Sequence, residues 1–294
     1  MSTISIVAVI CYLIFAPVAG LLVSGYDRVV TARMQGRQGP PFLQPLYDLV
    51  KLFRKEATIV NRVQTAMVVA FLIFQVFTGC IFFAGSDILL VFFALTLADV
   101  FLILAACSTN SPYSNLGSQR ELLSIMAYEP MTLLTAIGFY MVSKSFNVAD
   151  IISMDKPAIL QIPGIFIGYV FILIIKCRKS PFDLSTSHHA HQEMVKGLTQ
   201  DISGNVLGIM ELAELYASVL NMAVVGLFFV YRNPWSYLVA LLVCSVVYFI
   251  ILLIDNIFPR VKWNVMLWST WAVTFVFGGA NVLLLDMLKT AVKL

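Results

Sequence analysis

The stretch Ile88-Leu-Leu-Val-Phe-Phe-Ala-Leu-Thr-Leu-Ala-Asp-Val-Phe-Leu-Ile-Leu-Ala-Ala106 is apolar along its whole length, with Asp99 as its one ionisable residue. A helix needs about 20 predominantly apolar residues to cross the hydrocarbon core of a bilayer. Similar runs recur along the chain of 294 residues, of which 60% are hydrophobic and 12% are charged. Soluble domains carry about a quarter charged residues. The composition therefore predicts an integral membrane protein and argues against a soluble globular domain.

The apolar runs predict an all-α, polytopic membrane protein with about eight transmembrane helices joined by cytoplasmic loops. Each run is continuously apolar, without the alternation of a membrane-spanning strand. We find no internal repeat, low-complexity tract or flexible linker, so residues 1–294 are expected to form a single integral membrane domain. The expected spans cover residues 4–24, 66–84, 88–106, 122–142, 160–175, 206–230, 235–254 and 265–285.

The basic residues predict the orientation of these helices in the cytoplasmic membrane. Fourteen of the 19 lysines and arginines fall in or beside the loops that follow the first, third, fifth and seventh spans. Because positive charge is retained on the cytoplasmic side, we expect those loops in the cytoplasm and both termini outside. The net charge of +3 is then a topology signal, and it does not indicate binding to nucleic acid.

The five cysteines are scattered along the chain, and no two are close in sequence. Iron–sulfur and zinc sites need several cysteines or histidines at short, characteristic spacings. The spacing therefore predicts no cofactor and no metal site in this chain.

The first cytoplasmic loop predicts a short helix at the membrane surface. Its glycines and prolines oppose a helix at its start, but apolar and charged residues interleave from Leu46 onward. This is the pattern of an amphipathic helix lying in the interface. An anchoring role is the simpler interpretation, and docking of a cytoplasmic partner is compatible with it.

Four carboxylates are expected inside the membrane near the cytoplasmic ends of three spans: Asp99, Glu129, Glu211 and Glu214. At about 1.5 Å per residue, all four lie roughly 8–12 Å from those ends. Acids inside a bilayer are costly and usually mark ion or proton pathways. We therefore predict a proton or ion route, with hydrogen bonding between neighbouring helices as the structural alternative.

Glu121 has a simpler explanation than the four acids. Ser118 could cap the helix of the fourth span, and Glu121, three residues later, would complete a capping box.

The loop Ser180-Pro-Phe-Asp-Leu-Ser-Thr-Ser-His-His-Ala-His-Gln-Glu-Met-Val-Lys-Gly197 contains all three histidines of the chain. Pro181 ends the preceding helix, and Asp183 can cap the next segment. The histidines could bind a metal, but no fourth ligand is apparent. Proton handling is a better match, because an unperturbed histidine titrates near pH 6.5.

Three motifs in order resemble a known family. The first is Gly39-Pro-Pro-Phe-Leu-Gln-Pro-Leu-Tyr-Asp-Leu-Val-Lys-Leu-Phe-Arg-Lys-Glu56, the second is Glu121-Leu-Leu-Ser-Ile-Met-Ala-Tyr-Glu-Pro130, and the third is Pro181-Phe-Asp-Leu184. They look like the membrane subunit of respiratory complex I that borders its quinone chamber. The third motif departs from complex I, where it leads into a short acidic segment. The histidine-rich continuation instead resembles the corresponding subunit of group 4 energy-converting [NiFe] hydrogenases, including the Ech and formate-hydrogenlyase types.

The resemblance implies a coupling subunit that is not catalytic by itself. It would anchor hydrogenase large and small subunits, an iron–sulfur subunit and an antiporter-like membrane subunit, with ferredoxin as electron donor to the complex. The NiFe centre and iron–sulfur clusters would belong to those partners. The resemblance implies a junction with them at residues Arg37, Lys55, Glu56, Arg120, Glu121, Arg178, Asp183, His188, His189, His191, Glu193 and Asp201.

Three alternatives stay open at this point. The chain could be the quinone-chamber subunit of a complex I-like oxidoreductase, which would share the fold. It could be a stand-alone ion-coupled transporter, although the repeated halves and broken helices typical of that class are not found. It could also be a passive anchor, with ion movement handled by other subunits.

Overall fold

The computed structural model describes residues 3–56, 61–182, 185 and 196–293. Helices dominate the described residues, and they form no β-strand beyond one isolated bridge between Asp87 and Asn147. The helices are α1 (Thr3–Met34), α2 (Gln44–Arg54), α3 (Arg62–Phe83), α4 (Ile88–Cys107), α5 (Pro112–Ser143), α6 (Val148–Ile152), η1 (Ala158–Leu160), α7 (Pro163–Lys176), η2 (Gly197–Thr199), α8 (Gly204–Leu227), α9 (Trp235–Ile257), α10 (Trp263–Val273), the π-helical turn η3 (Thr274–Gly279) and α11 (Ala280–Lys293).

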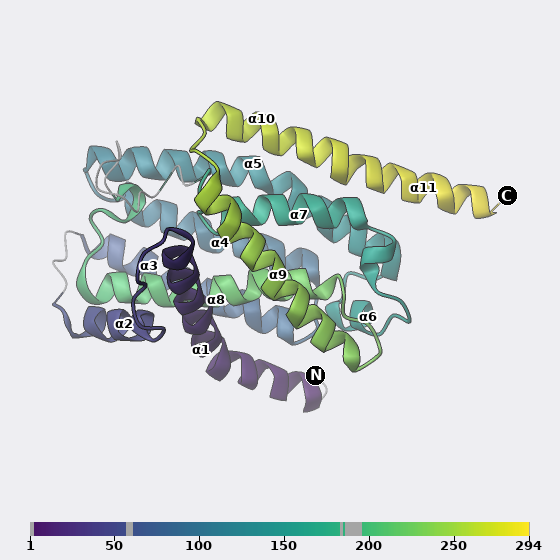
Figure 1. Ribbon diagram of the computed structural model, residues 1–294, viewed down its shortest axis with the longest axis horizontal. Helices are drawn as coiled ribbons and strands as arrows, with labels where there is room; N and C mark the ends of the chain where they lie inside the picture. The colour runs from purple at the N-terminus through teal and green to yellow at the C-terminus, as the bar shows by residue number, and fades with distance from the viewer. Residues whose placement is uncertain (1–2, 57–60, 183–184, 186–195, 294) are drawn as a thin grey trace.

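The long helices form a bundle whose central members run lengthwise beside one another (Figure 1). Helices α3, α4, α5, α7 and α8 make up this bundle, and α3 packs extensively on both α4 and α8. Helices α1 and α9 cross it obliquely, while α10, η3 and α11 continue as one rod along α5. Helix α1 bends part-way along, and Pro17 inside it removes a backbone hydrogen bond.

Seven helices of the described chain are long and apolar enough to cross a membrane, which confirms an all-α polytopic membrane protein. The fifth expected span, residues 160–175, corresponds to α7, which is apolar but has only 14 residues. Pro163 starts α7, and most of its later side chains are buried among neighbouring helices. A helix enclosed by protein does not need the length that contact with lipid on all sides would demand.

Two expected boundaries are wrong by about ten residues. Helix α1 continues to Met34, beyond the expected end at residue 24, and α5 begins at Pro112 instead of residue 122. Both extensions carry polar residues that a search for apolar runs leaves out. They project the ends of the two helices past the apolar zone, toward α2 and η2.

The amphipathic helix expected in the first loop is present as α2. Pro45 stands at its first turn, where a missing N–H costs nothing. Arg28 Nη1 of α1 lies 2.5 Å from Asp48 Oδ2 of α2 and ties the two helices together. Partial burial opposes ionisation of Asp48, but the hydrogen bonds from Arg28 and Gln44 outweigh it and lower the pKa of its carboxyl group.

The core and the outer surface of the bundle are both apolar. Phe139, Tyr169 and Phe228 are fully buried where α5, α7 and the end of α8 meet, and Phe228 lies against both other rings. On the outside, large apolar side chains such as Leu241 and Trp268 are strongly exposed. An apolar exterior around an apolar core is what a bilayer, and not water, stabilises.

The start of α5 approaches η2 so closely that only glycine fits between them. A Cβ atom added at Gly117 would lie 2.4 Å from the backbone nitrogen of Leu198. The contact involves backbone on the η2 side, so no side chain could move aside. Gly117 thus fixes the connection that leads from the Ser180–Gly197 loop into α8.

Replacement of Gly117 by alanine should therefore destabilise the protein by about 1–3 kcal/mol through overpacking. Gly208→Ala is the matched control, because its added Cβ would make only ordinary contacts of 3.4–3.5 Å with Leu52 and Phe53. Denaturant titration of the purified protein in detergent measures both. Equal stability of the two variants would contradict the close approach.

Candidate functional site: a charged chamber at one end of the bundle

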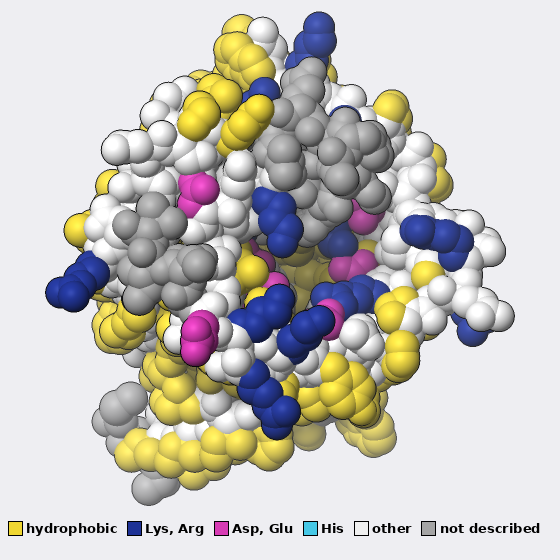
Figure 2. Space-filling model, turned by 90° about the vertical axis from the view of Figure 1, so that its left-hand side faces the viewer, with side chains coloured by type: hydrophobic (Ala, Val, Ile, Leu, Met, Phe, Trp, Pro, Cys, Tyr) yellow, Lys and Arg dark blue, Asp and Glu magenta, His cyan; other side chains and the backbone are white. Residues whose placement is uncertain are grey.

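A cavity of about 1260 Å³ opens at the end of the bundle where α2 lies. Its walls come from α1, α2, α8, α9 and residues 176–180, which form the end of α7 and the segment after it. Figure 2 shows this end of the molecule, with hydrophobic side chains on the floor of the hollow and Lys, Arg, Asp and Glu side chains around it. We call this cavity the chamber.

Arg178 links two carboxylates at the inner wall of the chamber. Its guanidinium donates through Nε and Nη2 to Glu121 Oε1 of α5, at 3.0 and 2.9 Å, and through Nη1 to Glu214 Oε1 of α8, at 2.5 Å. Burial opposes the charge of Arg178, but Glu121 and Glu214 outweigh it and raise the pKa of the guanidinium. The Arg178 backbone has φ of +49°, a left-handed conformation that non-glycine residues seldom adopt.

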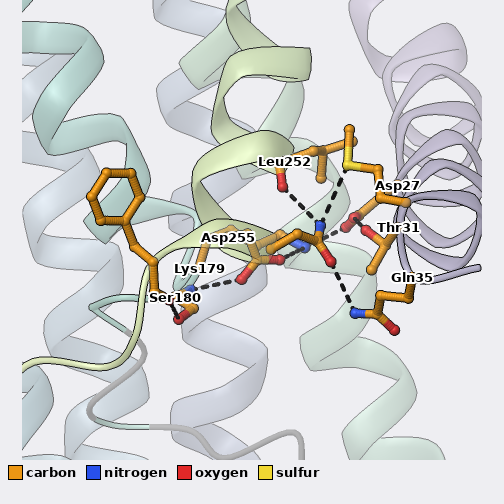
Figure 3. A network of polar contacts seen from close by, with 10 residues as sticks. Asp27, Thr31, Gln35, Lys179, Ser180, Leu252 and Asp255 are labelled. Carbon is orange, nitrogen blue, oxygen red and sulfur yellow. Dashed lines mark hydrogen bonds and ion pairs between the residues drawn. The ribbon is translucent and has the colours of Figure 1, made fainter.

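Lys179, the next residue, makes its contacts with a different wall (Figure 3). Its Nζ lies 2.6 Å from Asp27 Oδ2 of α1 and 3.6 Å from Asp255 Oδ2 of α9, and the backbone N–H of Ser180 donates to Asp255 Oδ1 at 2.9 Å. Burial again opposes the charge, but Asp27 and Asp255 together raise the pKa of Lys179. The two neighbouring cations therefore join α5 and α8 on one side and α1 and α9 on the other.

A second polar group lies deeper in the bundle, beside a cavity of about 30 Å³. Tyr128 of α5 donates its hydroxyl to Asp99 Oδ2 of α4 at 2.9 Å. The Lys176 ammonium lies 5.0 Å from the centroid of the Tyr128 ring. We call the space that these side chains line, together with Glu121, Ser124 and Asn221, the inner cavity.

Three of the four expected pathway acids line these two regions. Glu211 and Glu214 line the chamber, and Asp99 lines the inner cavity. Glu129 is half-buried and directly follows Tyr128, the partner of Asp99.

The predicted capping box at Ser118 and Glu121 is wrong, because the helix already starts at Pro112 with Ser111 as its N-cap. Ser118 instead donates its hydroxyl to the carbonyl of Asn115. Glu121 therefore does not cap the helix and forms an ion pair with Arg178, and its side chain is only 8% exposed. Its expected place at a partner interface is therefore also wrong, since it lies inside the protein.

Asp201 likewise has its contacts within the chain. Its Oδ2 accepts hydrogen bonds from Ser114 Oγ at 2.6 Å and from Thr109 Oγ1 at 3.2 Å, which holds the turn before α8 against α4 and α5. These contacts give Asp201 a structural role, and its expected contact with a partner stays a prediction.

The remaining junction residues are spread over the rim. Arg37 lines the chamber and contacts Gln35, whereas Lys55 and Glu56 are exposed beyond α2. Arg120 is half-buried in α5. Five expected site residues lie outside the described residues: Asp183, His188, His189, His191 and Glu193.

Sequence reasoning missed several charged residues of the site. Asp27 and Asp255 are not among the predicted site residues, yet both pair with Lys179. Lys176, which lines both cavities, is also absent from the predicted set. The usable signal was the density of charge in Lys176-Cys177-Arg178-Lys179, since three cations beside an apolar helix need anionic partners.

The described part of the chain holds no group of three or more His, Cys, Asp or Glu side chains that could bind a metal ion. Cys177 lies between Lys176 and Arg178 in the sequence, and burial raises the pKa of its thiol to about 11. A thiol that stays protonated at neutral pH is a poor metal ligand.

A family model described as NADH dehydrogenase matches residues 6–286, almost the whole chain. The chain belongs to the NADH dehydrogenase family. The H subunit of the NADH-quinone oxidoreductase of Geobacillus kaustophilus is 28% identical over 90% of this chain and 87% of its own length. Formate hydrogenlyase subunit 4 of Escherichia coli is 25% identical over 85% of this chain and 89% of its own.

The fold of this member of the NADH dehydrogenase family also occurs in a solved structure. A chain of the membrane-bound sulfane sulfur reductase, an archaeal respiratory membrane complex, superposes with a TM-score of 0.84 over 96% of this chain and 99% of that chain, at 22% identity. The resemblance to the complex I membrane subunit is thereby confirmed. The chain is a complex I-like membrane subunit, in keeping with the expectation that redox cofactors belong to partner subunits.

Arg178→Ala should destabilise this protein by about 3–5 kcal/mol, because it leaves the buried Glu121 carboxylate without its partner. Glu214 is 40% exposed and should contribute little of that loss. Adding Glu121→Gln to the variant removes the uncompensated charge and should restore part of the stability, as a double-mutant cycle in detergent would measure.

Arg232→Ala is the control for this prediction. Arg232 also pairs with a carboxylate, Asp155, but at 3.9 Å and with side chains 79% and 88% exposed. Its loss should change stability by less than about 0.5 kcal/mol. An Arg178 variant as stable as this control would refute the buried network.

Proposed function

We propose that this chain is the membrane anchor and coupling subunit of an energy-converting [NiFe] hydrogenase complex. It links ferredoxin-dependent reduction of protons to hydrogen, carried out on partner subunits, with the movement of protons or sodium ions. The chamber faces the cytoplasm, both termini lie outside, and the hydrogenase arm docks over the chamber. An iron–sulfur subunit and the large and small subunits form that arm, and an antiporter-like subunit adjoins the bundle in the membrane.

One observation carries the coupling role: Arg178 joins a chamber carboxylate, Glu214, to Glu121, which lines the inner cavity. Glu121 and Asp99 border the same inner cavity, so the polar groups form a series from the chamber into the bundle. A change of charge in the chamber would alter the field at Glu214 and, through Arg178, at Glu121. Field effects of this kind are strong where water is scarce.

The choice of hydrogenase is based on sequence. The segment after Pro181-Phe-Asp-Leu184 carries three histidines in place of the acidic segment of complex I, and formate hydrogenlyase subunit 4 is among the relatives. The imidazoles of this segment are suited to exchange protons near neutral pH.

A second candidate is a quinone-chamber subunit of a complex I-like oxidoreductase. Two observations favour it: several relatives are named as the H subunit of an NADH-quinone oxidoreductase, and the chamber of about 1260 Å³ has an apolar floor. That volume exceeds the range of about 300–1000 Å³ that is usual for pockets of small ligands. The charged side chains of the lining, among them Arg178 and Lys179, are less suited to an apolar quinone ring than the floor.

Membrane vesicles that contain the whole complex separate the two candidates. With reduced ferredoxin as donor, they should evolve hydrogen and build an ion gradient that an uncoupler or sodium ionophore collapses. Vesicles from a strain lacking this chain are the control and should do neither. Reduction of added quinone with no hydrogen evolution would replace our proposal by the second candidate.

Glu214→Gln and Glu129→Gln should each lower gradient formation by about tenfold while leaving assembly of the complex intact, because Glu214 belongs to the series and Glu129, a half-buried acid next to Tyr128, is a predicted pathway group. The gradient is followed with a pH-sensitive dye and assembly by native electrophoresis. Asp155→Asn is the control, since the side chain of Asp155 is 88% exposed and lines neither cavity.

A complex that forms normal gradients with both variants would show that this chain is a passive anchor. Loss of assembly in either variant would instead assign the carboxylate a structural role.

A further inference from the structure

Two residues line both the chamber and the inner cavity, Lys176 of α7 and Asn221 of α8, and we call them the wall between the two spaces. Any water or ion that passes between the two cavities has to pass these groups. The chemistry of Lys176 and Asn221 therefore decides what can cross.

Asn221 is a buried amide with an unsatisfied acceptor. Its side chain is 5% exposed, and no group of the described chain donates a hydrogen bond to its Oδ1 atom. Buried amide oxygens nearly always have a partner, either protein or water. Because Asn221 lines the inner cavity, its free acceptor can be satisfied from there.

The inner cavity has the size and the lining of a site for a single water molecule. Its volume of about 30 Å³ exceeds the ~10–15 Å³ that a water needs. A buried water also needs two to four polar partners. Besides Asn221 Oδ1, the cavity offers the Asp99 carboxylate, the Lys176 ammonium and the Ser124 hydroxyl.

The charge of the lining favours water over a metal cation. Glu121 is neutralised by Arg178, which leaves Asp99 as the local anion and Lys176 as the local cation. A sodium ion in the same space would stand next to an ammonium of equal sign, and this repulsion is strong away from bulk water. A neutral water can donate to Asp99 and Asn221 and accept from Lys176.

We infer that the inner cavity is a one-water site held by Asn221, and that the tethered Lys176 ammonium makes this passage conduct protons and exclude sodium ions. Asn221 is a positioning residue here, since it acts through the water that it holds. The inference deepens the proposed coupling role and rests on it for the transported ion. The water site itself stands on geometry alone.

Two measurements test the inference separately. The first is a cryo-EM map of the purified complex at a resolution that shows ordered waters. One peak within hydrogen-bonding distance of Asn221 Oδ1 and a second polar group is expected in the wild type and should be absent in Asn221→Leu. A wild-type map with no peak in the inner cavity overturns the water site, whatever hydrogen evolution or ion movement the complex shows.

The second measurement is proton movement per hydrogen evolved in sealed vesicles. Asn221→Leu should lower this ratio by about tenfold, because it removes the acceptor that orients the water. Asn221→Asp keeps an acceptor oxygen and should retain most of the wild-type ratio of protons moved per hydrogen evolved. Gln75→Leu is the matched control, since Gln75 is a fully buried amide with unpartnered atoms that lines neither cavity. An unchanged ratio in Asn221→Leu overturns the positioning role.

The ion is tested in sodium-depleted and sodium-replete buffers. The wild-type ratio should be the same in both buffers. In Lys176→Gln, which lacks the ammonium, the ratio should fall when sodium is added. Wild-type gradient formation that requires sodium overturns the exclusion. A wild type that evolves hydrogen without any gradient would refute the coupling role itself, and the map would still decide the water site.

Discussion

The guanidinium of Arg178, held between Glu121 and Glu214, is the interaction on which the arrangement of the chamber depends. A cation withdrawn from water needs charged partners of good geometry, and here they come from two helices far apart in the sequence. The segment after α7 has to enter the cavity to bring this cation there, and the left-handed backbone at Arg178 is part of that path. With Arg178 in this position, the neighbouring Lys179 extends to the opposite wall, where it pairs with Asp27 and Asp255.

The membrane class and the approximate spans can be predicted from the sequence because continuous apolarity is a direct physical requirement of the bilayer. The surface helix α2 can be predicted in the same way, from the interleaving of Lys51 and Arg54 with apolar residues. The ends of α1 and α5 cannot, since polar helix that projects beyond the bilayer looks like loop to a search for apolar runs. The pairing of Glu121 with Arg178 was hidden for that reason: with the helix start placed too late, Glu121 sat where a capping residue belongs.

The same limit applies when the partners of charged side chains are predicted from the sequence. The positions of Asp99 and Glu214 along their helices can be predicted from the sequence of a single helix, because they depend only on distance from the helix end. The partners of Lys179 cannot, because Asp27 and Asp255 are separated from it by 152 and 76 positions and meet it only when α1 and α9 cross the bundle. Sequence therefore indicates which charges need a partner, and the crossing angles of the helices decide which partner they find.

The fold is common to membrane subunits of complexes whose names refer to quinone, formate and sulfane sulfur. Fold alone therefore cannot assign the electron acceptor, which is a property of partners and of the chamber lining. What the bundle itself provides is a separation of two polar regions by a thin wall, made here by Lys176 and Asn221. A wall of one ammonium and one amide can respond to charge in the chamber without any large movement of helices, because both side chains line the chamber as well as the inner cavity. The electrostatics of this wall would then matter more for coupling than the shape of the chamber.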